Sequence, residues 1–212
     1  MPLKLLIVDD HLIIRRGLAQ LLALDARVGT VHEAPDGPAA LRALRGERYD
    51  AMVLDVALGE RDGLDVLKTV RAEFPALGVV MLSVYPESQF AVRALRAGAH
   101  AYLNKGCQPE ELLDALGRAA AGQMYVTPAV AELLARNVRR DGAEAPHELL
   151  SNREFQVLQL LVAGKSVSAI AEQLALSANT ISTYRARIFD KLDVRTLVEL
   201  IAYANRHQLG AR

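Results

Sequence analysis

The chain has 212 residues, of which 51% are hydrophobic, and Lys plus Arg balance Asp plus Glu at 25 each. This length suits one large domain or two small ones, and the composition is that of a soluble globular protein. The single cysteine, Cys107, excludes an internal disulfide and a cysteine-rich zinc site. No apolar stretch approaches the roughly 20 residues of a membrane span, and the run Leu5–Val8 is too short for a signal peptide. We therefore expect a cytoplasmic protein, and a neutral total charge does not exclude nucleic acid as its partner.

Short apolar runs alternate with amphipathic stretches through the first part of the chain. The predicted strands are Leu3–Val8, Val28–Glu33, Ala51–Leu54, Gly78–Leu82 and His100–Leu103. The predicted helices between and after them are Leu12–Leu24, Pro38–Arg45, Leu64–Phe74, Gln89–Ala97 and Pro109–Ala121. Alternation of this kind predicts an α/β doubly wound domain, a five-stranded parallel sheet with helices on both faces, over residues 1–122.

A different pattern follows the predicted sheet. Tyr125–Arg140 is expected to form a helix with Thr127 as its N-cap and Pro128 as its first residue. The polar stretch "RRDGAEAPHE" reads as a flexible linker, so residues 123–147 are predicted to be a helical segment and linker.

The last part of the chain, residues 148–212, is predicted to be an all-α domain of four short helices. Its 8 basic and 6 acidic residues over 147–212 give a net charge of +2, whereas 14 basic and 16 acidic residues over 1–122 give −2. The signs favour an acidic site in the first domain and an anion-binding module in the second.

Five polar residues occupy the ends of predicted strands. Asp9 and Asp10 follow the first strand, Asp55 the third, Ser83 the fourth and Lys105 the fifth. Ligands of open α/β sheets bind at this edge, and clustered carboxylates repel one another unless a cation such as Mg²⁺ lies among them. Asp55 would then act as a nucleophile that forms an acyl phosphate. Each aspartate alone is more often a turn former or helix cap, but five independent positions together favour a site.

Four segments carry a family resemblance: "LLIVDDH", "AMVLDVALGERDGL", "VVMLSVYPE" and "GAHAYLNKG". Together they resemble the CheY-like receiver domain of two-component response regulators, over all of residues 1–122. The resemblance implies that Asp55 accepts a phosphoryl group from a sensor histidine kinase. It also implies that Mg²⁺ is held by Asp9, Asp10 and Asp55 with the backbone carbonyl of Ala57.

The same resemblance assigns the residues that respond to the phosphoryl group. Ser83 and Lys105 match the pair that binds it and reads the phosphorylated state. Tyr102 matches the aromatic residue that rotates inward with Ser83, although an aromatic in a strand commonly serves only as packing.

The sequence departs from the family after the phosphorylated aspartate. The family often has Met-Pro where this chain has Leu58 and Gly59, whereas Gly63 stands where a glycine is expected. We expect a looser loop here, with an effect on the lifetime of the phosphoryl group.

The C-terminal part contains a helix-turn-helix pattern. Ser151 and Glu154 form a capping box, Ser168–Leu174 is a short helix, and a further helix begins near Ala178 after a tight turn. The outer face of that helix predicts contacts with DNA bases or phosphates. The candidate DNA-binding residues are Asn179, Thr180, Ser182, Thr183, Tyr184, Ala186, Arg187 and Lys191. An ordinary exposed helix face is the alternative for this helix taken alone.

The whole segment resembles the LuxR-type helix-turn-helix, through "LSNRE", "VLQLLVAGKS", "IAEQLALSANTIS" and "RIFDKLDV". A receiver joined to this module is the architecture of NarL/FixJ-type regulators. The resemblance implies a fourth helix, Thr196–His207, that takes part in dimerisation. Ser182 and Tyr184 replace residues that are common in the family, so family contacts at these positions transfer weakly.

We therefore expect a phosphorylation-controlled transcription factor that is not an enzyme. Its partners would be a sensor histidine kinase, a double-stranded DNA site of two-fold symmetry and a second copy of the chain, with no membrane. One alternative is a Mg²⁺-dependent aspartyl-phosphate phosphohydrolase, although in such enzymes the nucleophile usually follows the first strand. Another is a constitutive DNA-binding regulator whose receiver is only a dimerisation platform.

Overall fold

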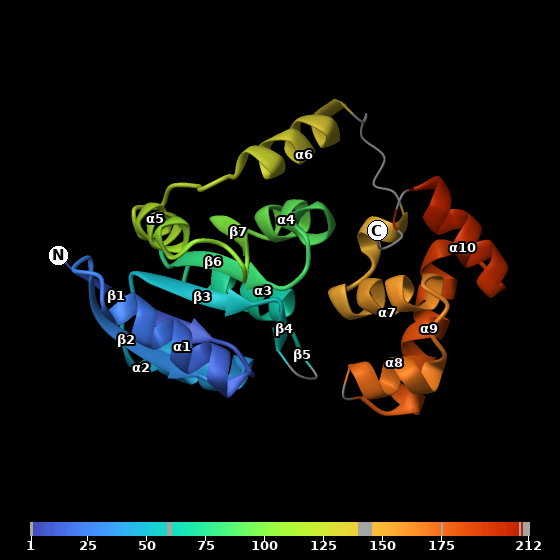
Figure 1. Cartoon of the computed structure of the whole chain (residues 1–212), viewed down its shortest axis with the longest axis horizontal. Coiled ribbons are helices and arrows are strands. Elements are labelled where there is room, and N and C mark those ends of the chain that lie inside the picture. The colour runs from blue at the N-terminus through green and yellow to red at the C-terminus, as the bar shows by residue number, and fades with distance from the viewer. Residues whose placement is uncertain (1, 59–60, 140–145, 175, 208, 210–212) are drawn as a thin grey trace. The chain divides into compact units, whose positions relative to one another are not determined.

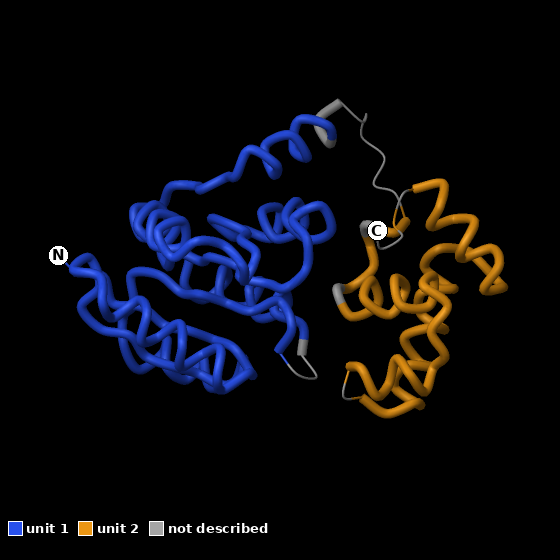
Figure 2. Tube along the Cα trace, viewed as in Figure 1, with its two compact units in different colours: residues 1–140 blue, residues 141–212 orange. Residues whose placement is uncertain are grey.

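The computed structural model describes residues 2–212 except 59–60, 140–145, 175, 208 and 210–212. The chain forms two compact units, residues 1–140 and residues 141–212 (Figure 2). Each unit has its own packed elements and is described by itself.

The first unit is built on a five-stranded parallel sheet with strand order β2-β1-β3-β6-β7 (Figure 1). Its strands are β1 (Leu3–Val8), β2 (Val28–Ala34), β3 (Ala51–Asp55), β6 (Gly78–Ser83) and β7 (Ala101–Asn104). The chain moves to one side of β1 to form β2 and then returns to form β3 on the other side. The predicted doubly wound sheet is confirmed, and each predicted strand agrees with the observed one to within one residue at either end.

Five helices cover the two faces of the sheet. They are α1 (Leu12–Ala23), α2 (Gly37–Gly46), α3 (Gly63–Glu73), α4 (Glu87–Arg96) and α5 (Pro109–Ala120). Leu5 and Ile7 of β1 pack with Leu22 of α1 and Leu116 of α5 in one hydrophobic cluster. Because side chains alternate along a strand, Leu6 points to the opposite face of the sheet and is fully buried there. Both faces of the central strands are therefore apolar, as a parallel sheet requires.

A short antiparallel pair follows β3 and was not predicted. β4 (Ala57–Leu58) pairs with β5 (Arg61–Asp62) before α3 begins. Leu58 is buried, and Gly59, on which the expectation of a looser loop depended, lies outside the described residues.

The helix α6 (Pro128–Arg139) belongs to the first unit and packs against α4 (Figure 1). It begins at Pro128, the predicted first helical residue. The predicted range Tyr125–Arg140 extended three residues too far toward the N-terminus, where the backbone N–H of Tyr125 instead donates to the carbonyl of His100. Thr127 accepts a hydrogen bond from the N–H of Val130, as predicted for the N-cap, and its hydroxyl also donates to Glu87 of α4 at 2.9 Å. A tertiary contact thus fixes where this helix starts.

The second unit is helical over its described residues. Its elements are the 3₁₀ helix η1 (Pro146–Leu149) and the α-helices α7 (Asn152–Val162), α8 (Val167–Gln173), α9 (Ala178–Leu192) and α10 (Leu197–Arg206). The predicted capping box is present: Ser151 Oγ accepts from the N–H of Glu154, whose carboxylate accepts from the N–H of Ser151. The side chains of Ser166 and Ser177 also cap α8 and α9, each by accepting a hydrogen bond from the backbone N–H three residues on, so a serine marks the start of both helices of the helix-turn-helix pair.

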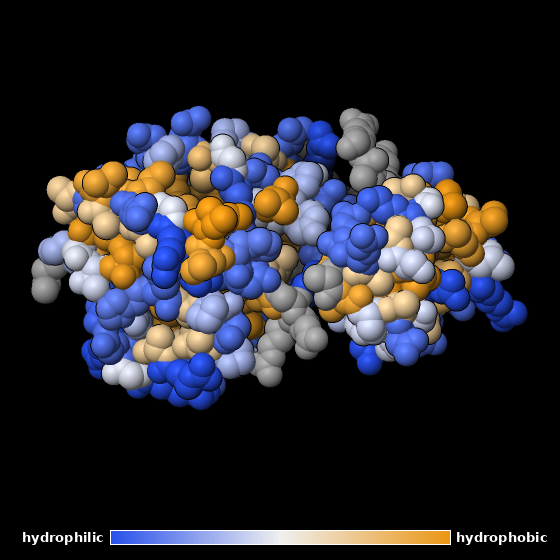
Figure 3. Space-filling model, turned by 60° about the horizontal axis from the view of Figure 1, so that its bottom comes forward, coloured by the Kyte–Doolittle hydropathy of each residue, from blue (hydrophilic) through white to orange (hydrophobic). Residues whose placement is uncertain are grey.

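None of the helices in the described part of the chain is long and apolar enough to cross a membrane. Hydrophobic residues nevertheless reach the surface of the first unit (Figure 3). Ile13 on α1 is 87% exposed, and its neighbour Leu12 is 50% exposed. This exposed apolar pair directly follows the two aspartates and His11 at the end of β1.

Candidate functional site

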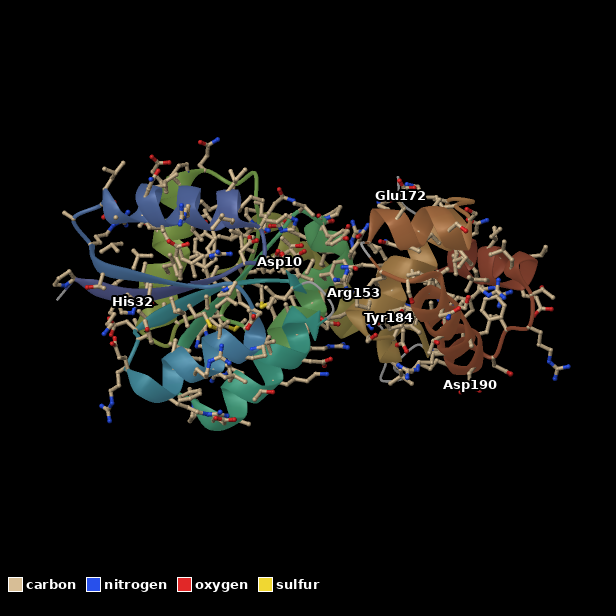
Figure 4. The ribbon with its side chains drawn as sticks, turned by 90° about the horizontal axis from the view of Figure 1, so that it is seen from below. Asp10, His32, Arg153, Glu172, Tyr184 and Asp190 are labelled. Carbon is tan, nitrogen blue, oxygen red and sulfur yellow. The ribbon has the colours of Figure 1, made fainter. Side chains whose placement is uncertain are left out.

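The end of β1 carries an acidic pair that differs in burial. Asp9 is almost completely buried, whereas Asp10 is exposed at the sheet's edge (Figure 4). The Oδ1 atom of Asp9 accepts a hydrogen bond from the backbone N–H of His11 at 2.7 Å. His11 Nδ1 lies 2.8 Å from Asp10 Oδ1 and 3.3 Å from Asp9 Oδ1. The turn between β1 and α1 thus holds two carboxylates and an imidazole together.

Asp55 ends β3, the strand beside β1, and only 3% of it is exposed. Lys105, which follows β7, reaches across this edge of the sheet. Its Nζ atom lies 2.6 Å from Asp9 Oδ2 and 2.8 Å from Asp55 Oδ2. Asp9 and Lys105, 96 positions apart in the sequence, are therefore in contact, as expected from their places at the ends of parallel strands. We call Asp9, Asp10, Asp55 and Lys105 the acidic site.

Burial and charge act against each other on the titrating groups of this site. The pKa of Asp55 is raised to about 6, chiefly by burial; Lys105 opposes the rise, and the neighbouring carboxylate of Asp9 adds to it. Burial alone would lower the pKa of Lys105, but Asp55 and Asp9 more than offset it and raise that pKa above its ordinary value. Lys105 therefore stays protonated at neutral pH and stabilises the charged form of Asp55.

The donor set of the acidic site suits a divalent cation. Ligand atoms of Asp9, Asp10, His11 and Asp55 all lie within 4.8 Å of one another. Three carboxylates beside one ammonium group leave an excess of two negative charges when all are ionised. Carboxylate oxygens are the ligands that Mg²⁺ prefers, so the residues present fit such an ion. Ala57, the predicted source of a backbone ligand, lies in β4 two residues beyond Asp55.

The predicted switch residues lie next to this edge of the sheet. Ser83 ends β6, which pairs with β3, and its buried Oγ accepts a hydrogen bond from the N–H of Tyr85 at 3.1 Å. The hydroxyl of Tyr102 donates to the backbone carbonyl of Tyr85 at 2.9 Å, and the residue is only 2% exposed. Burial raises the pKa of this phenol well above its ordinary value. Tyr102 therefore points inward, with its hydroxyl bound to the Tyr85 carbonyl.

Sequence reasoning missed two residues around the acidic site. His11 was hidden in the motif "VDDH", although its position directly after the aspartates was a signal. Arg15 lies one turn into α1, where its side chain is 10% exposed and contacts the Asp9 carbonyl. A lone arginine in a helix pattern normally indicates a solvated face, so its burial had no signal in the sequence.

In the second unit, α9 presents the predicted polar face to solvent. Tyr184 and Asp190 show where this helix lies in Figure 4. Its buried side is formed by Ile181, Ile188 and Leu192. The candidate DNA-binding residues that are exposed are Asn179, Ser182, Thr183, Ala186, Arg187 and Lys191. Thr180 and Tyr184 are half-buried, and the hydroxyl of Thr180 lies 2.8 Å from that of the N-cap Ser177.

Lys191 has a structural partner within this unit. Its Nζ atom donates to Glu154 Oε2 at 2.7 Å and to the Leu149 carbonyl at 3.2 Å. Burial would raise the pKa of Glu154, but its hydrogen bonds with Lys191 and Ser151 lower that pKa below its ordinary value. Both basic candidates, Arg187 and Lys191, are exposed, but Lys191 also binds Glu154 and so connects α9 to α7.

Comparison with known proteins assigns both parts of the chain. Residues 5–117 match the response regulator receiver domain, and residues 148–204 match the bacterial regulatory proteins of the luxR family. The chain is 35% identical to the response regulator GacA of Pseudomonas syringae pv. syringae over 206 residues, which is 97% of this chain and 96% of that protein. This chain belongs to the two-component response regulators, of the NarL/FixJ type.

Further relatives agree with this assignment. The response regulator UvrY of Escherichia coli is 32% identical over 208 residues, 98% of this chain and 95% of that protein. A solved structure of the two-component response regulator RcsB in complex with DNA has a TM-score of 0.59 and 25% identity, and the match covers 97% of this chain and 98% of that one. The response regulator therefore matches its relatives along both units.

Proposed function

We propose that this response regulator is a transcription factor switched by Mg²⁺-dependent phosphorylation of Asp55 by a sensor histidine kinase. The observation that carries the proposal is the acidic site, where Lys105 joins two buried carboxylates from different strands. Mg²⁺ would be held by Asp9, Asp10, Asp55 and the Ala57 carbonyl, and when bound it supplies positive charge to a transferring phosphoryl group.

The protein's own contribution to the chemical step is the nucleophile and the groups that orient the phosphoryl oxygens. An Asp55 carboxylate oxygen attacks phosphorus, the P–N bond of a phosphohistidine breaks, and the released imidazole takes a proton from solvent. Lys105 and Ser83 then bind phosphoryl oxygens.

The exposed apolar pair Leu12 and Ile13 beside the site offers a contact for the kinase, because apolar surface of this kind commonly marks protein interfaces.

The output of the switch is DNA binding by α9. Among solved relatives, RcsB from Salmonella enterica serovar Typhimurium is described bound to a promoter in the presence of a phosphomimetic. We infer that this chain likewise binds double-stranded DNA as a homodimer when phosphorylated, on a site of two-fold symmetry. The predicted contact residues on α9 remain proposals, as do the domain limits 1–122 and 148–212 and the roles given to Ser83 and Tyr102. A regulator of DNA acts where DNA is, which favours the cytoplasm.

The test compares the wild-type protein, Asp55→Asn and Asp65→Asn after incubation with Mg²⁺ and acetyl phosphate. Asp65 is an exposed carboxylate on α3 and serves as the matched control. Wild type and Asp65→Asn should gain one phosphoryl group by intact mass and bind a DNA duplex more tightly, and Asp55→Asn should do neither. Phosphorylation-enhanced binding that persists in Asp55→Asn would contradict the proposal.

A constitutive regulator is the second candidate, and one observation favours it. Tyr102 is buried against the Tyr85 carbonyl in the unmodified chain. If this inward position suffices for activity, Asp55→Asn and unphosphorylated wild type would bind DNA as tightly as the phosphorylated protein. The same experiment therefore separates the two functions.

We propose no enzymatic turnover for this chain, because the aspartyl phosphate serves as a signal. Incubation with a small phosphoester should release at most one equivalent of its alcohol, because the phosphoryl group transferred to Asp55 stays there. Continued release that depends on Asp55 would support the phosphohydrolase alternative instead.

A further inference from the structure

Arg15 is a buried arginine to which the proposed function gives no role. It lies in the first turn of α1, and its side chain is only 10% exposed. Its Nη1 atom donates to the backbone carbonyl of Asp9 at 2.5 Å, and its Nε donates to Glu33 Oε2 of β2 at 3.1 Å. Burying a guanidinium costs free energy unless its N–H groups are hydrogen-bonded, and these two contacts supply such bonds.

The contact with the Asp9 carbonyl fixes the peptide that joins the two aspartates. That peptide plane contains the carbonyl of Asp9 and the N–H of Asp10, so its orientation sets the direction in which Asp10 leaves the strand. The N–H of Asp9 is already bound to the Ala34 carbonyl at 3.3 Å, and its carboxylate accepts from the N–H of His11. Arg15 therefore supplies a third fixed point to a turn that carries two proposed metal ligands.

A bridge to a neighbouring strand makes this third point rigid. Glu33 is in register with Ile7, and β1 and β2 pair through Val8 and Ala34 at the end of the sheet. Because Arg15 binds both Glu33 and the Asp9 carbonyl, the turn cannot shift without breaking a bond to β2. Groups that orient metal ligands in this way commonly change metal affinity by roughly 10–100-fold when they are removed.

We propose that Arg15 is a positioning residue for the divalent cation at the acidic site. It holds the Asp9–Asp10 peptide in the orientation that lets both carboxylates reach one ion. This inference rests on the proposed function, since it requires that Asp9, Asp10 and Asp55 bind Mg²⁺.

Charge and position predict opposite effects for Arg15, which makes the inference testable. A guanidinium beside a cation site repels the cation, so its removal would tighten Mg²⁺ binding if charge were its only influence. Removal of a positioning group instead weakens binding. A purely structural role would lower the melting temperature and leave the Mg²⁺ affinity of the folded protein unchanged.

The experiment measures the Mg²⁺ dissociation constant of the full-length protein by isothermal titration calorimetry at fixed ionic strength. Thermal unfolding without Mg²⁺ is recorded for the same samples. The variants are Arg15→Gln, Arg15→Lys and the control Arg16→Gln, which removes the same charge from an exposed neighbour. Arg15→Lys keeps the charge but lacks the planar fork that reaches two acceptors, so it reports on geometry alone and serves if Arg15→Gln does not fold.

We expect Arg15→Gln and Arg15→Lys to bind Mg²⁺ roughly tenfold more weakly than wild type, and Arg16→Gln to bind it as tightly or slightly more tightly. Mg²⁺ binding by folded Arg15→Lys with the affinity of wild type would overturn the inference while leaving the proposed function intact. A wild-type protein that binds no Mg²⁺ would overturn both.

Discussion

The backbone at Gly63 lies too close to the end of β3 to leave room for a side chain. A Cβ atom placed on it would lie 2.1 Å from the Asp55 carbonyl oxygen and 2.9 Å from that of Val56. The N–H of Gly63 also donates to the Val56 carbonyl at 2.9 Å, so the two segments cannot separate freely. A glycine is required here by close approach.

Gly63→Ala should therefore displace the backbone at Asp55. We expect unfolding to become easier by about 1–3 kcal/mol, as for other overpacked sites, and phosphorylation by acetyl phosphate to slow. Urea unfolding and the rate of mass gain measure the two effects. Gly17→Ala on α1 is the control, because nothing lies within 4 Å of its Cβ position, and it should stabilise the protein by about 0.4–1 kcal/mol. Wild-type stability and rate in Gly63→Ala would show that the loop relaxes.

His100 gives the first unit a pH dependence of known sign. Its Nδ1 atom accepts a hydrogen bond from the N–H of Val79 at 3.1 Å, so this nitrogen must be unprotonated. Burial, and to a smaller degree the charge of Arg71, lowers the pKa of His100 below its ordinary value of 6.5. In the unfolded chain the imidazole therefore takes up a proton at a higher pH than in the folded protein, and acid favours unfolding.

The contribution of His100 to stability should be complete above pH 6.5, where the imidazole is neutral in both states, and should be lost as the pH falls through its folded pKa. The urea midpoint of wild type, measured from about pH 8 down to about pH 5, should thus fall more steeply than that of His100→Gln, which keeps an acceptor but does not titrate. Parallel curves for the two proteins would contradict the assignment.

At the scale of elements, hydrophobic periodicity was enough to predict those helices and strands that need no specific partner residue. The strands of the sheet and α1 to α5 need only an apolar face and a turn, and the sequence carries both signals. For α6 the N-cap Thr127 and first residue Pro128 were predicted correctly, but the predicted range also included Tyr125, whose N–H binds the His100 carbonyl. Such a pairing depends on where two distant segments meet, and no local pattern encodes it.

The candidate site follows the same division. Asp55 and Lys105 were predictable because parallel strands end at one edge, so position along the strand was enough. The role of Arg15 was not predictable, because it depends on a contact with the Asp9 backbone carbonyl that no sequence pattern indicates. The inward position of Tyr102 is also a property of packing, since the same residue in the same strand can point either way.

At the scale of the whole molecule, the part with the acidic site and the part with the proposed DNA-binding helix carry net charges of opposite sign. Residues 1–122 carry a net −2 and residues 147–212 a net +2, although the total is zero. The two basic residues proposed to bind phosphate on α9 differ in whether they already have an acidic partner within the protein. Lys191 neutralises Glu154, whereas the exposed Arg187 is the stronger candidate for a DNA phosphate.

Removal of a phosphate-binding side chain should therefore be visible in the salt dependence of DNA binding. For a mixed-sequence duplex, the slope of log K against log salt should become shallower in Arg187→Gln by about 0.9 for each phosphate that the protein no longer neutralises. Lys68→Gln, which removes an exposed lysine of the first unit, controls for total charge. Lys191→Gln should mainly lower the stability of the second unit, since it leaves Glu154 without its cation. Binding isotherms between roughly 50 and 200 mM salt, the range over which such slopes are measured, decide between these roles. An Arg187→Gln slope equal to that of Lys68→Gln would remove Arg187 from the DNA interface.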